Sequence, residues 1–329
     1  MTAGTDTTPP PVSVLGIGAV TPLGRDVAAM AQKLSAPAVA DAPTRNVSDE
    51  WLTDPRAGGR LRRADRFTRM AVVAALDAVE AARTDFGDSS GPVGLILATG
   101  LGPHVRTFRF LDGILDFGDS SALPTDFSHS VHNAAAAYIA ELTALRGQTC
   151  TITDFETGFE QAILLAQCWL AAGSCARVLV GAVDELGAVM LNMTQRVLSD
   201  IAVRPGEGAV FLALGPADRA GCAQIDATAT PAAADLLIVD QPPILPPTAA
   251  PWAQAIDARQ TTTFTPYFGH LPSSSALATL GGLLSLRHRR ALGSLVHAEA
   301  GHTVVDRAVT LKRLWSGQTS TLGLANSRI

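Results

Sequence analysis

Hydrophobic residues form short runs separated by glycine, proline and polar positions, and the runs differ in their period. Residues 12–20, 91–98 and 176–183 are continuous apolar runs, which predict strands buried on both faces. Residues 148–153 alternate between polar and apolar positions, which is also typical of a strand. Residues 70–82 repeat apolar positions at helical spacing. The first half of the chain is therefore predicted to alternate strands with helices.

The stretch 158–172 (GFEQAILLAQCWLAA) is apolar nearly all round, and Gly173 follows it. Such a pattern predicts a helix that is buried on every side. With the strands expected on either side of it, this helix would form a βαβ unit covered on both faces.

The second half repeats the pattern more loosely. Strands are expected at 208–214 and 236–239, and a helix at 274–289, with three serines in its first turn that could cap it: Ser273, Ser274 and Ser275. Residues 295–299 and 303–311 could form the last hairpin.

Two similar halves without a linker predict one internally duplicated α/β domain. Its expected parts are a flexible tail at 1–11, a first half at 12–200, a shortened second half at 201–315 and a polar tail at 316–329.

Composition narrows the class of protein. Hydrophobic residues make up 47% of the chain and charged residues 17%, so either the core is large or another chain covers part of the surface. A net charge of −5 argues against nucleic-acid binding. We expect no signal peptide, no membrane span and a cytoplasmic location. Four cysteines without metal-ligand spacing are expected to be buried free thiols: Cys150, Cys168, Cys175 and Cys222.

Four segments occur in the order found in one known family. They are VLGIGAVTPLG at 14–24, RRADRFTRMAVVAALDAVEAA at 62–82, RPGEGAVFLAL at 204–214 and FGHLPSSSALATLGGLLSLRH at 268–288. Together they resemble the β-ketoacyl-acyl carrier protein synthases, or ketosynthases. The resemblance implies a thiolase-like fold, with two duplicated βαβαβαββ halves in alternating helix and sheet layers.

The segment PTDFSHSVHNAAAAYIA at 124–140 resembles the shortened synthase-like proteins of aryl-polyene pathways. Compared with a typical synthase, the chain is shorter between residues 223 and 235 and in the loop before His270. His129 and His132 lie three residues apart, but no thiol or carboxylate accompanies them, so neither a metal nor a cofactor is predicted.

The resemblance also implies where catalytic groups should be. The nucleophilic cysteine of the family, at the start of the helix 158–172, matches Phe155. Asp240 or its neighbour Gln241 takes the place of the first histidine, and Thr265 that of the lysine. Only the second histidine is retained, as His270. The glycine–phenylalanine loop is altered, at residues 299–302.

These changes imply a catalytically silent subunit that resembles the chain-length factors. It would pair with an active ketosynthase in polyketide, polyene or fatty-acid synthesis and help to shape the acyl tunnel. Candidate tunnel and interface residues are Phe108, Phe110, Leu111, Phe127 and Phe155. The alternative for the first four of these is ordinary core packing.

Two other functions stay open. His270 with Asp154 or Glu156 could form a carboxylate–histidine pair for thioester hydrolysis or decarboxylation. A carboxylate at a helix N-terminus is equally an ordinary cap. A module that only binds acyl carrier protein is the other possibility, because a basic cluster could attract that acidic partner. The cluster contains Arg56, Arg60, Arg62, Arg63, Arg66 and Arg69. A solvated arginine-rich face would explain it as well.

Overall fold

The computed structural model describes most of the chain. The described residues are 8–38, 44–83, 91–197, 204–230, 232–240, 256–298, 304–314 and 318–327. In these residues the strands form one sheet with the order β3-β2-β4-β5-β1-β6-β11-β10-β7-β8-β9.

Five strands make up the first half of the sheet: β1 (Val12–Val20), β2 (Val93–Thr99), β3 (Thr149–Thr153), β4 (Arg177–Asp184) and β5 (Gly208–Pro216). Strand β2 lies parallel to β3 and β4, whereas β5 lies antiparallel to β4 and β1. The strands expected at 12–20, 91–98, 148–153, 176–183 and 208–214 are thus all present. Continuous apolar runs were a sound guide for β1, β2, β4 and β5 because both faces of these four strands are covered.

The second half contains β6 (Ala223–Asp226), β7 (Ala233–Asp240), β8 (Asp257–Thr263), β9 (Ser294–Ala298), β10 (Arg307–Arg313) and β11 (Thr319–Asn326). Its pairing repeats that of the first half: β7 is parallel to β8 and β10, and β11 is antiparallel to β10 and β6. Strands β1 and β6 join the halves, with Val12 opposite Ile225. The strand pairing therefore shows the expected duplication directly.

The strand order can be compared with the boundary expected at 200/201. Strand β5 (Gly208–Pro216) completes the first set of five strands, and β6 (Ala223–Asp226) begins the second set. Residues 227–232 link β6 to β7 with no helix among those described, and residues 241–255 lie outside the described residues. In the described chain the second half is therefore a duplicate in its strand order but not in all of its helices.

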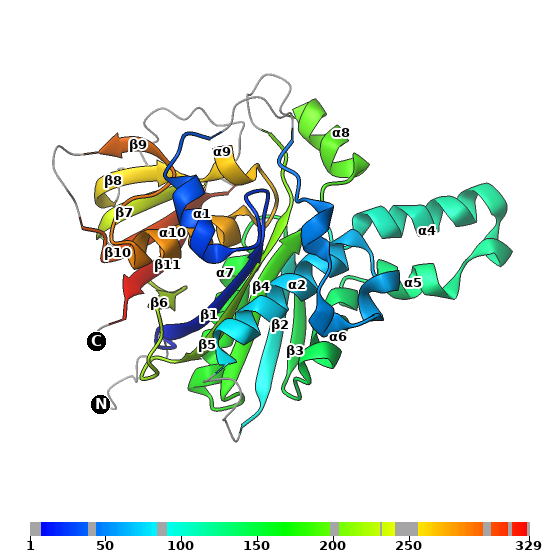
Figure 1. Ribbon diagram of the computed structural model, residues 1–329, viewed down its shortest axis with the longest axis horizontal. Helices are drawn as coiled ribbons and strands as arrows, with labels where there is room; N and C mark the ends of the chain where they lie inside the picture. Colours follow the sequence, from blue (N-terminus) through cyan, green and yellow to red (C-terminus); the bar gives the residue numbers. More distant parts are fainter. Residues whose placement is uncertain are drawn as a thin grey trace, which may run out of the picture.

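Helices and sheet alternate in layers (Figure 1). One face of the first-half strands carries α2 (Arg66–Ala81) and α6 (Ala134–Thr143), with Phe67, Leu95 and Phe211 in the core between them. The opposite face carries α7 (Gly158–Ala171), which shares a second core with α10 (Ser274–Arg287) and the second-half strands. The alternating layers of the thiolase-like fold are confirmed.

Strand β1 and helix α2 approach each other so closely that β1 needs glycine. A Cβ atom on Gly18 would lie 2.1 Å from the carbonyl oxygen of Ala74 in α2, and one on Gly16 would lie 2.4 Å from that of Ala78. The glycines of the segment 14–24 are thus explained by packing.

The remaining helices lie around these layers. They are α1 (Val27–Leu34), α4 (His104–Phe117), α5 (Pro124–Ser130), α8 (Ala188–Val197) and α9 (Thr265–Phe268), with short 3₁₀ turns at Asp49–Leu52, Pro55–Ala57, Arg60–Arg63 and Asp119–Ser121. Helices α4 and α5 run side by side and extend away from the body of the molecule (Figure 1). We call the segment 104–130 the arm.

Three sequence predictions about local structure were wrong. Helix α7 is not buried on every side, since Gln161, Leu164 and Cys168 are exposed on the face that no other described element covers. The last hairpin is formed by β10 and β11, whereas β9 pairs with β8. Residues 319–326, expected in a polar tail, form β11, which pairs with β10 and β6 and buries Leu322 and Leu324.

Candidate functional site

The loop between β3 and α7 is the place where the family resemblance expects a nucleophile. Here Asp154 Oδ1 accepts hydrogen bonds from the backbone N–H groups of Glu156 (2.8 Å) and Thr157 (2.5 Å). Partial burial opposes ionisation, but these bonds outweigh it and lower the pKa of Asp154. The carboxylate therefore acts as a cap, and two N–H groups at the mouth of the helix are already bound.

No thiol lies in this loop. Phe155 is 52% exposed, so its ring lies at the surface of the chain. Cys150 is within β3 and Cys168 is on the exposed face of α7. Of the four cysteines only Cys175 is buried, which corrects the expectation for Cys168 and Cys222.

The serines that begin α10 do not cap it by side-chain hydrogen bonds. Each hydroxyl donates to a buried carboxylate from another element. The pairs are Ser273 with Asp184 (2.6 Å), Ser274 with Asp240 (2.7 Å) and Ser275 with Glu160 (3.1 Å). Because these carboxylates come from β4, β7 and α7, the bonds tie the two halves together where their central helices meet.

Lys312, near the end of β10, supplies a buried positive charge to this cluster. Its Nζ donates to the carbonyl oxygen of Pro272 at 2.9 Å and lies 4.0 Å from Asp240 Oδ2. Burial raises the pKa of Glu160, which Lys312 opposes. The position that the resemblance assigns to a catalytic histidine, Asp240, is thus part of a fixed polar network.

His270 is held next to this network by its backbone. Its N–H donates to Arg204 and its carbonyl oxygen accepts from Gly206, at 2.8 and 3.0 Å. Burial lowers the pKa of the imidazole to about 4. The charge of Asp240 opposes this shift, whereas the charge of Lys312 adds to it. The ring is therefore neutral at pH 7. Its buried Nδ1 has no hydrogen-bond partner in the described part of the chain.

Little space exists beside these groups. Thr265, at the family's lysine position, begins α9, and its hydroxyl accepts a bond of 3.3 Å from Thr263. The cavity that Thr265 lines with Asp240 and Ser274 measures about 10 Å³. That volume holds about one water molecule. Gln241 and residues 299–302, which the sequence also implicated, lie outside the described residues.

The tunnel candidates are located on the arm. Phe108 and Leu111 are both 45% exposed on α4, and Phe127 is exposed on α5. Phe110 is half-buried and packs against Phe127, with ring centroids 5.7 Å apart, so it belongs to the interior of the arm. Core packing of the body, the alternative for these residues, does not explain the three exposed ones.

The basic cluster divides into structural and exposed arginines. Arg66 donates to the buried carboxylate of Glu207 at 2.6 Å, and Arg69 donates to the carbonyl oxygens of Ala64 and Arg62. Arg60, Arg62 and Arg63 are exposed, and Arg60 lies 3.3 Å from Glu141. The sequence assigned Arg66 to carrier docking, but its guanidinium group is engaged by Glu207.

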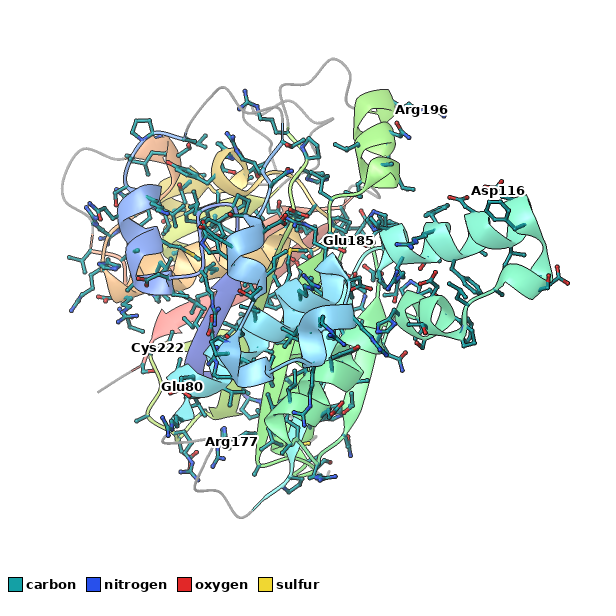
Figure 2. The ribbon with its side chains drawn as sticks, turned by 45° about the vertical axis from the view of Figure 1, so that its right-hand side comes forward. Glu80, Asp116, Arg177, Glu185, Arg196 and Cys222 are labelled. Carbon is teal, nitrogen blue, oxygen red and sulfur yellow. The ribbon has the colours of Figure 1, made fainter. Side chains whose placement is uncertain are left out.

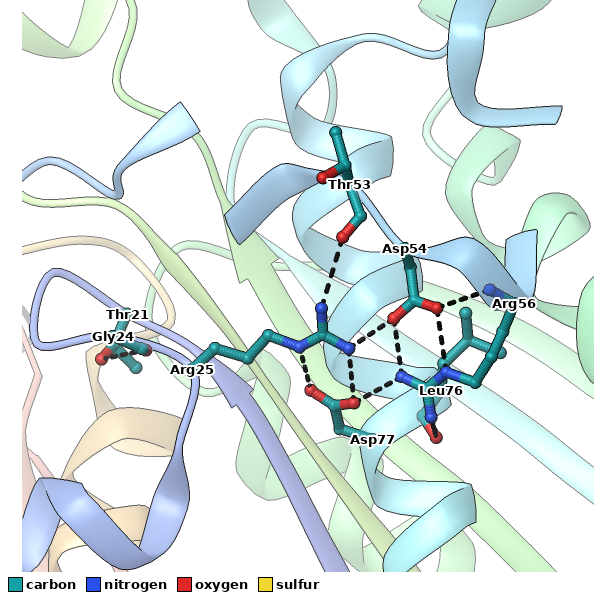
Figure 3. Close-up of polar contacts among 8 residues, drawn as sticks. All are labelled: Thr21, Gly24, Arg25, Thr53, Asp54, Arg56, Leu76 and Asp77. Atoms are coloured by element: carbon teal, nitrogen blue, oxygen red, sulfur yellow. Dashed lines mark hydrogen bonds and ion pairs between the residues drawn. The ribbon is translucent and has the colours of Figure 1, made fainter. Parts of the chain in front are cut away.

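Arg56 is also engaged, in the cluster drawn in Figure 3. It shares the carboxylates of Asp54 and Asp77 with Arg25, and its Nη2 lies 2.7 Å from Asp54 and 2.5 Å from Asp77. These four charges fasten the segment before α2 to α2 itself.

His129 has an internal role. Its Nδ1 donates to the carbonyl oxygen of Thr125 (2.7 Å), and its Nε2 accepts from the hydroxyl of Tyr138 (2.8 Å), which joins α5 to α6. Sequence reasoning missed Glu160, Asp184 and Lys312. For Glu160 the available signal was a charged residue inside the apolar run 158–172. Asp184 and Lys312 gave none, because their partners are distant in sequence.

Comparisons with known proteins agree with this architecture. Residues 60–205 match the family model described as beta-ketoacyl synthase, N-terminal domain. A β-ketoacyl synthase from Burkholderia phymatum STM815 superposes with a TM-score of 0.77 at 16% identity, over 97% of this chain and 100% of that one. No curated protein matches the sequence.

Two further structures give similar values. A chain of AntDE:AntF, a type II polyketide synthase carrier protein in complex with its ketosynthase, has a TM-score of 0.75 at 19% identity, over 96% of this chain and 99% of that one. The ishigamide ketosynthase/chain length factor has a TM-score of 0.73 at 15% identity, over 97% and 99%. The fold is thus the thiolase-like α/β fold of the ketosynthases. The match over residues 60–205 adds a similarity in sequence to the β-ketoacyl synthases over that part of the chain.

Proposed function

We propose that this chain is a catalytically silent ketosynthase-like subunit that pairs with an active β-ketoacyl-acyl carrier protein synthase. The observation that carries the proposal is the start of α7, where Asp154 caps the helix and Phe155 stands in place of a thiol. Condensation by this family needs a thiolate to hold the acyl chain. Neither side chain can be acylated to form a thioester, so the chain has to work beside another subunit.

The surface around this loop supports pairing. Strand β3 is at one end of the sheet and, in the described chain, pairs only with β2. An unpaired edge invites a strand from another molecule. Phe155 and Leu164 of α7, the helix that follows β3, are large exposed apolar side chains. The arm adds others, of which Leu115 is 81% exposed. Apolar surface of this kind is typical of protein interfaces.

The arm supports a role in the acyl tunnel. Phe108 and Leu111 are on the exposed face of α4, where a partner could contact them. The ishigamide structure is a ketosynthase/chain length factor, which is a precedent for such a role in a protein of this fold. We extend the proposal to polyketide, polyene or fatty-acid synthesis, with aryl polyenes favoured by the segment 124–140.

The test is co-expression with the active ketosynthase encoded beside this chain, followed by native mass measurement. We expect a stable one-to-one complex. Leu115→Asp should abolish it, because the charge would be buried at the interface, whereas its exposure makes misfolding a minor concern. The matched control is Leu295→Asp on β9, at the other end of the sheet, which should leave the complex intact.

A second outcome would favour the hydrolase or decarboxylase alternative. The charged groups that affect His270 are Asp240 and Lys312, and the Asp154 carboxylate is occupied as a cap. If the pure chain turned over an acyl thioester and lost that activity in the His270→Ala variant, the non-catalytic proposal would fail.

A further inference from the structure

A groove of about 560 Å³ lies between the arm and the start of α8. Its size is within the range of small-molecule sites. The apolar part of its lining includes Val105, Phe108, Phe117, Leu123, Ala188 and Val189. Figure 2 shows the setting: Arg196 marks α8, Asp116 the outer part of α4, and Glu185 the body near the base of the arm.

The buried side chain of His104 lines the floor of this groove, and the buried side chain of Glu185 lies next to its ring. His104 begins α4 and is 3% exposed; Glu185 follows β4 and is 2% exposed. His104 Nδ1 lies 3.8 Å from Glu185 Oε1, too far for a hydrogen bond. Neither ring nitrogen has a hydrogen-bond partner in the described chain. An unpartnered histidine at the base of a groove is costly unless something binds to it.

Both side chains are neutral at pH 7. Burial lowers the pKa of His104, and burial raises the pKa of Glu185 to about 8. A neutral imidazole offers one donor and one acceptor. Glu185 Oε1 already accepts from the N–H of Val105 at 3.0 Å, which holds the base of α4 in place.

The mouth of the groove selects against anions. Asp112 and Asp116 line it, and the only positive side chain in the lining is Arg109. A third carboxylate, Asp126, pairs with Arg106 at 3.0 Å. A free carboxylate would therefore be repelled at the mouth and meet no fixed charge at the floor.

Gly187, where the chain turns into α8, keeps the floor compact. A Cβ there would lie 2.6 Å from His104 Nε2 and 2.4 Å from a methyl group of Val105. Only glycine lets α8 start this close to the ring.

We propose that this groove binds a neutral aliphatic chain that carries a hydroxyl or carbonyl group, with His104 as the residue that recognises the oxygen. The apolar walls would contact the aliphatic part of the ligand, and His104 at the floor would bind its oxygen atom. Under the proposed function, on which this identification rests, the ligand is the distal end of an oxygenated acyl chain. The groove itself belongs to this chain, so its binding can be measured without a partner.

The experiment is calorimetric titration of the isolated full-length chain with methyl 10-hydroxydecanoate and with methyl decanoate. The hydroxy ester should bind more tightly. His104→Phe should weaken its binding by about threefold to tenfold, as expected for one hydrogen bond, and leave methyl decanoate unchanged. H104Q, which keeps a donor and an acceptor, should restore part of the preference. His297→Phe on exposed β9 is the matched control.

Equal binding of both esters, no binding of either, or equal losses in H104F would overturn the inference. If H104F does not fold, ring-nitrogen NMR of histidine-labelled wild type decides, because the hydroxy ester alone should shift the His104 signals. Pairing is measured separately by native mass. A chain that fails to pair but keeps the ester preference would overturn the proposed function alone.

Discussion

At the scale of single residues, the proposal of a silent subunit depends on Phe155, Asp240 and the helix cap Asp154. Under the proposed function Phe155 stands in place of the acylatable group. Asp240 joins a polar network, and Asp154 binds N–H groups at the start of α7. The cavity that Asp240 lines with Thr265 measures about 10 Å³. Because Asp154 would still bind the N–H groups of α7 and Asp240 would stay in its network, we expect that a cysteine at position 155 alone does not restore condensation.

Glu185 gives a prediction about stability and pH. Burial, with repulsion from Asp65 and Glu207, raises its pKa from 4.5 to about 8, although the Val105 N–H opposes this. Because the folded state holds this proton more tightly than the unfolded state, stability from the group is complete below pH 4.5 and is lost as pH rises through 8. The loss is on the order of a few kcal/mol.

Glu185→Gln keeps the acceptor for Val105 and removes the titration. We expect the melting temperature of E185Q to equal that of wild type near pH 4.5 and to exceed it by several degrees at pH 8. Thermal unfolding followed by circular dichroism across this range measures the difference. A gap that stays constant with pH would show that Glu185 is not a buried neutral acid.

At the scale of elements, the arm is the part most directly tied to product length. Phe108→Ala in the reconstituted pair should lengthen products by at least one two-carbon unit, because it removes a bulky side chain that is 45% exposed on α4. Mass spectrometry of the products gives the answer. Leu295→Ala, on β9 at the other end of the sheet, is the control and should not change length. Unchanged length in F108A and in a Leu111→Ala variant would remove the tunnel assignment.

The exposed arginines before α2 give a second prediction for an element. Reversing Arg62 and Arg63 to glutamate should weaken binding of acyl carrier protein by about tenfold at low salt, with a smaller effect at high salt. Binding measured by surface plasmon resonance tests this. Reversal of Arg289 and Arg290 makes the same change in net charge on the second half and should have little effect; an equal loss there would mean that only net charge matters.

The helices and strands also show how much of the fold could be predicted from the sequence. Continuous apolar runs located β1, β2, β4 and β5, because strands buried on both faces leave a local signal. Strand β11 was missed because small polar residues surround its two buried leucines. The arm was placed among core or interface segments, since an exposed apolar stripe has the same period as a buried one.

The candidate site was only partly predictable for a related reason. The changed positions Phe155, Asp240 and Thr265 follow from alignment to family motifs. The network that surrounds them depends on pairs far apart in the chain, such as Ser275 with Glu160. The ion pair of Arg66 could not be predicted for the same reason. Its partner Glu207 is 141 residues away in the sequence, and no local pattern near Arg66 indicates the pair.

At the scale of the whole molecule, a duplicated sheet is joined at β1 and β6 and ends at one side in the unpaired edge of β3. The second half has fewer helices in its described residues than the first. No helix in the described residues is long and apolar enough to cross a membrane. The exposed edge, the exposed face of α7 and the arm together form the surface on which pairing is proposed.

The most direct test of a silent subunit is covalent labelling of the assembled pair. The complex would be incubated with a radiolabelled acyl thioester, denatured, and its two chains separated and counted. The account predicts label on the partner ketosynthase alone. Label bound covalently to this chain near residue 155 would contradict it.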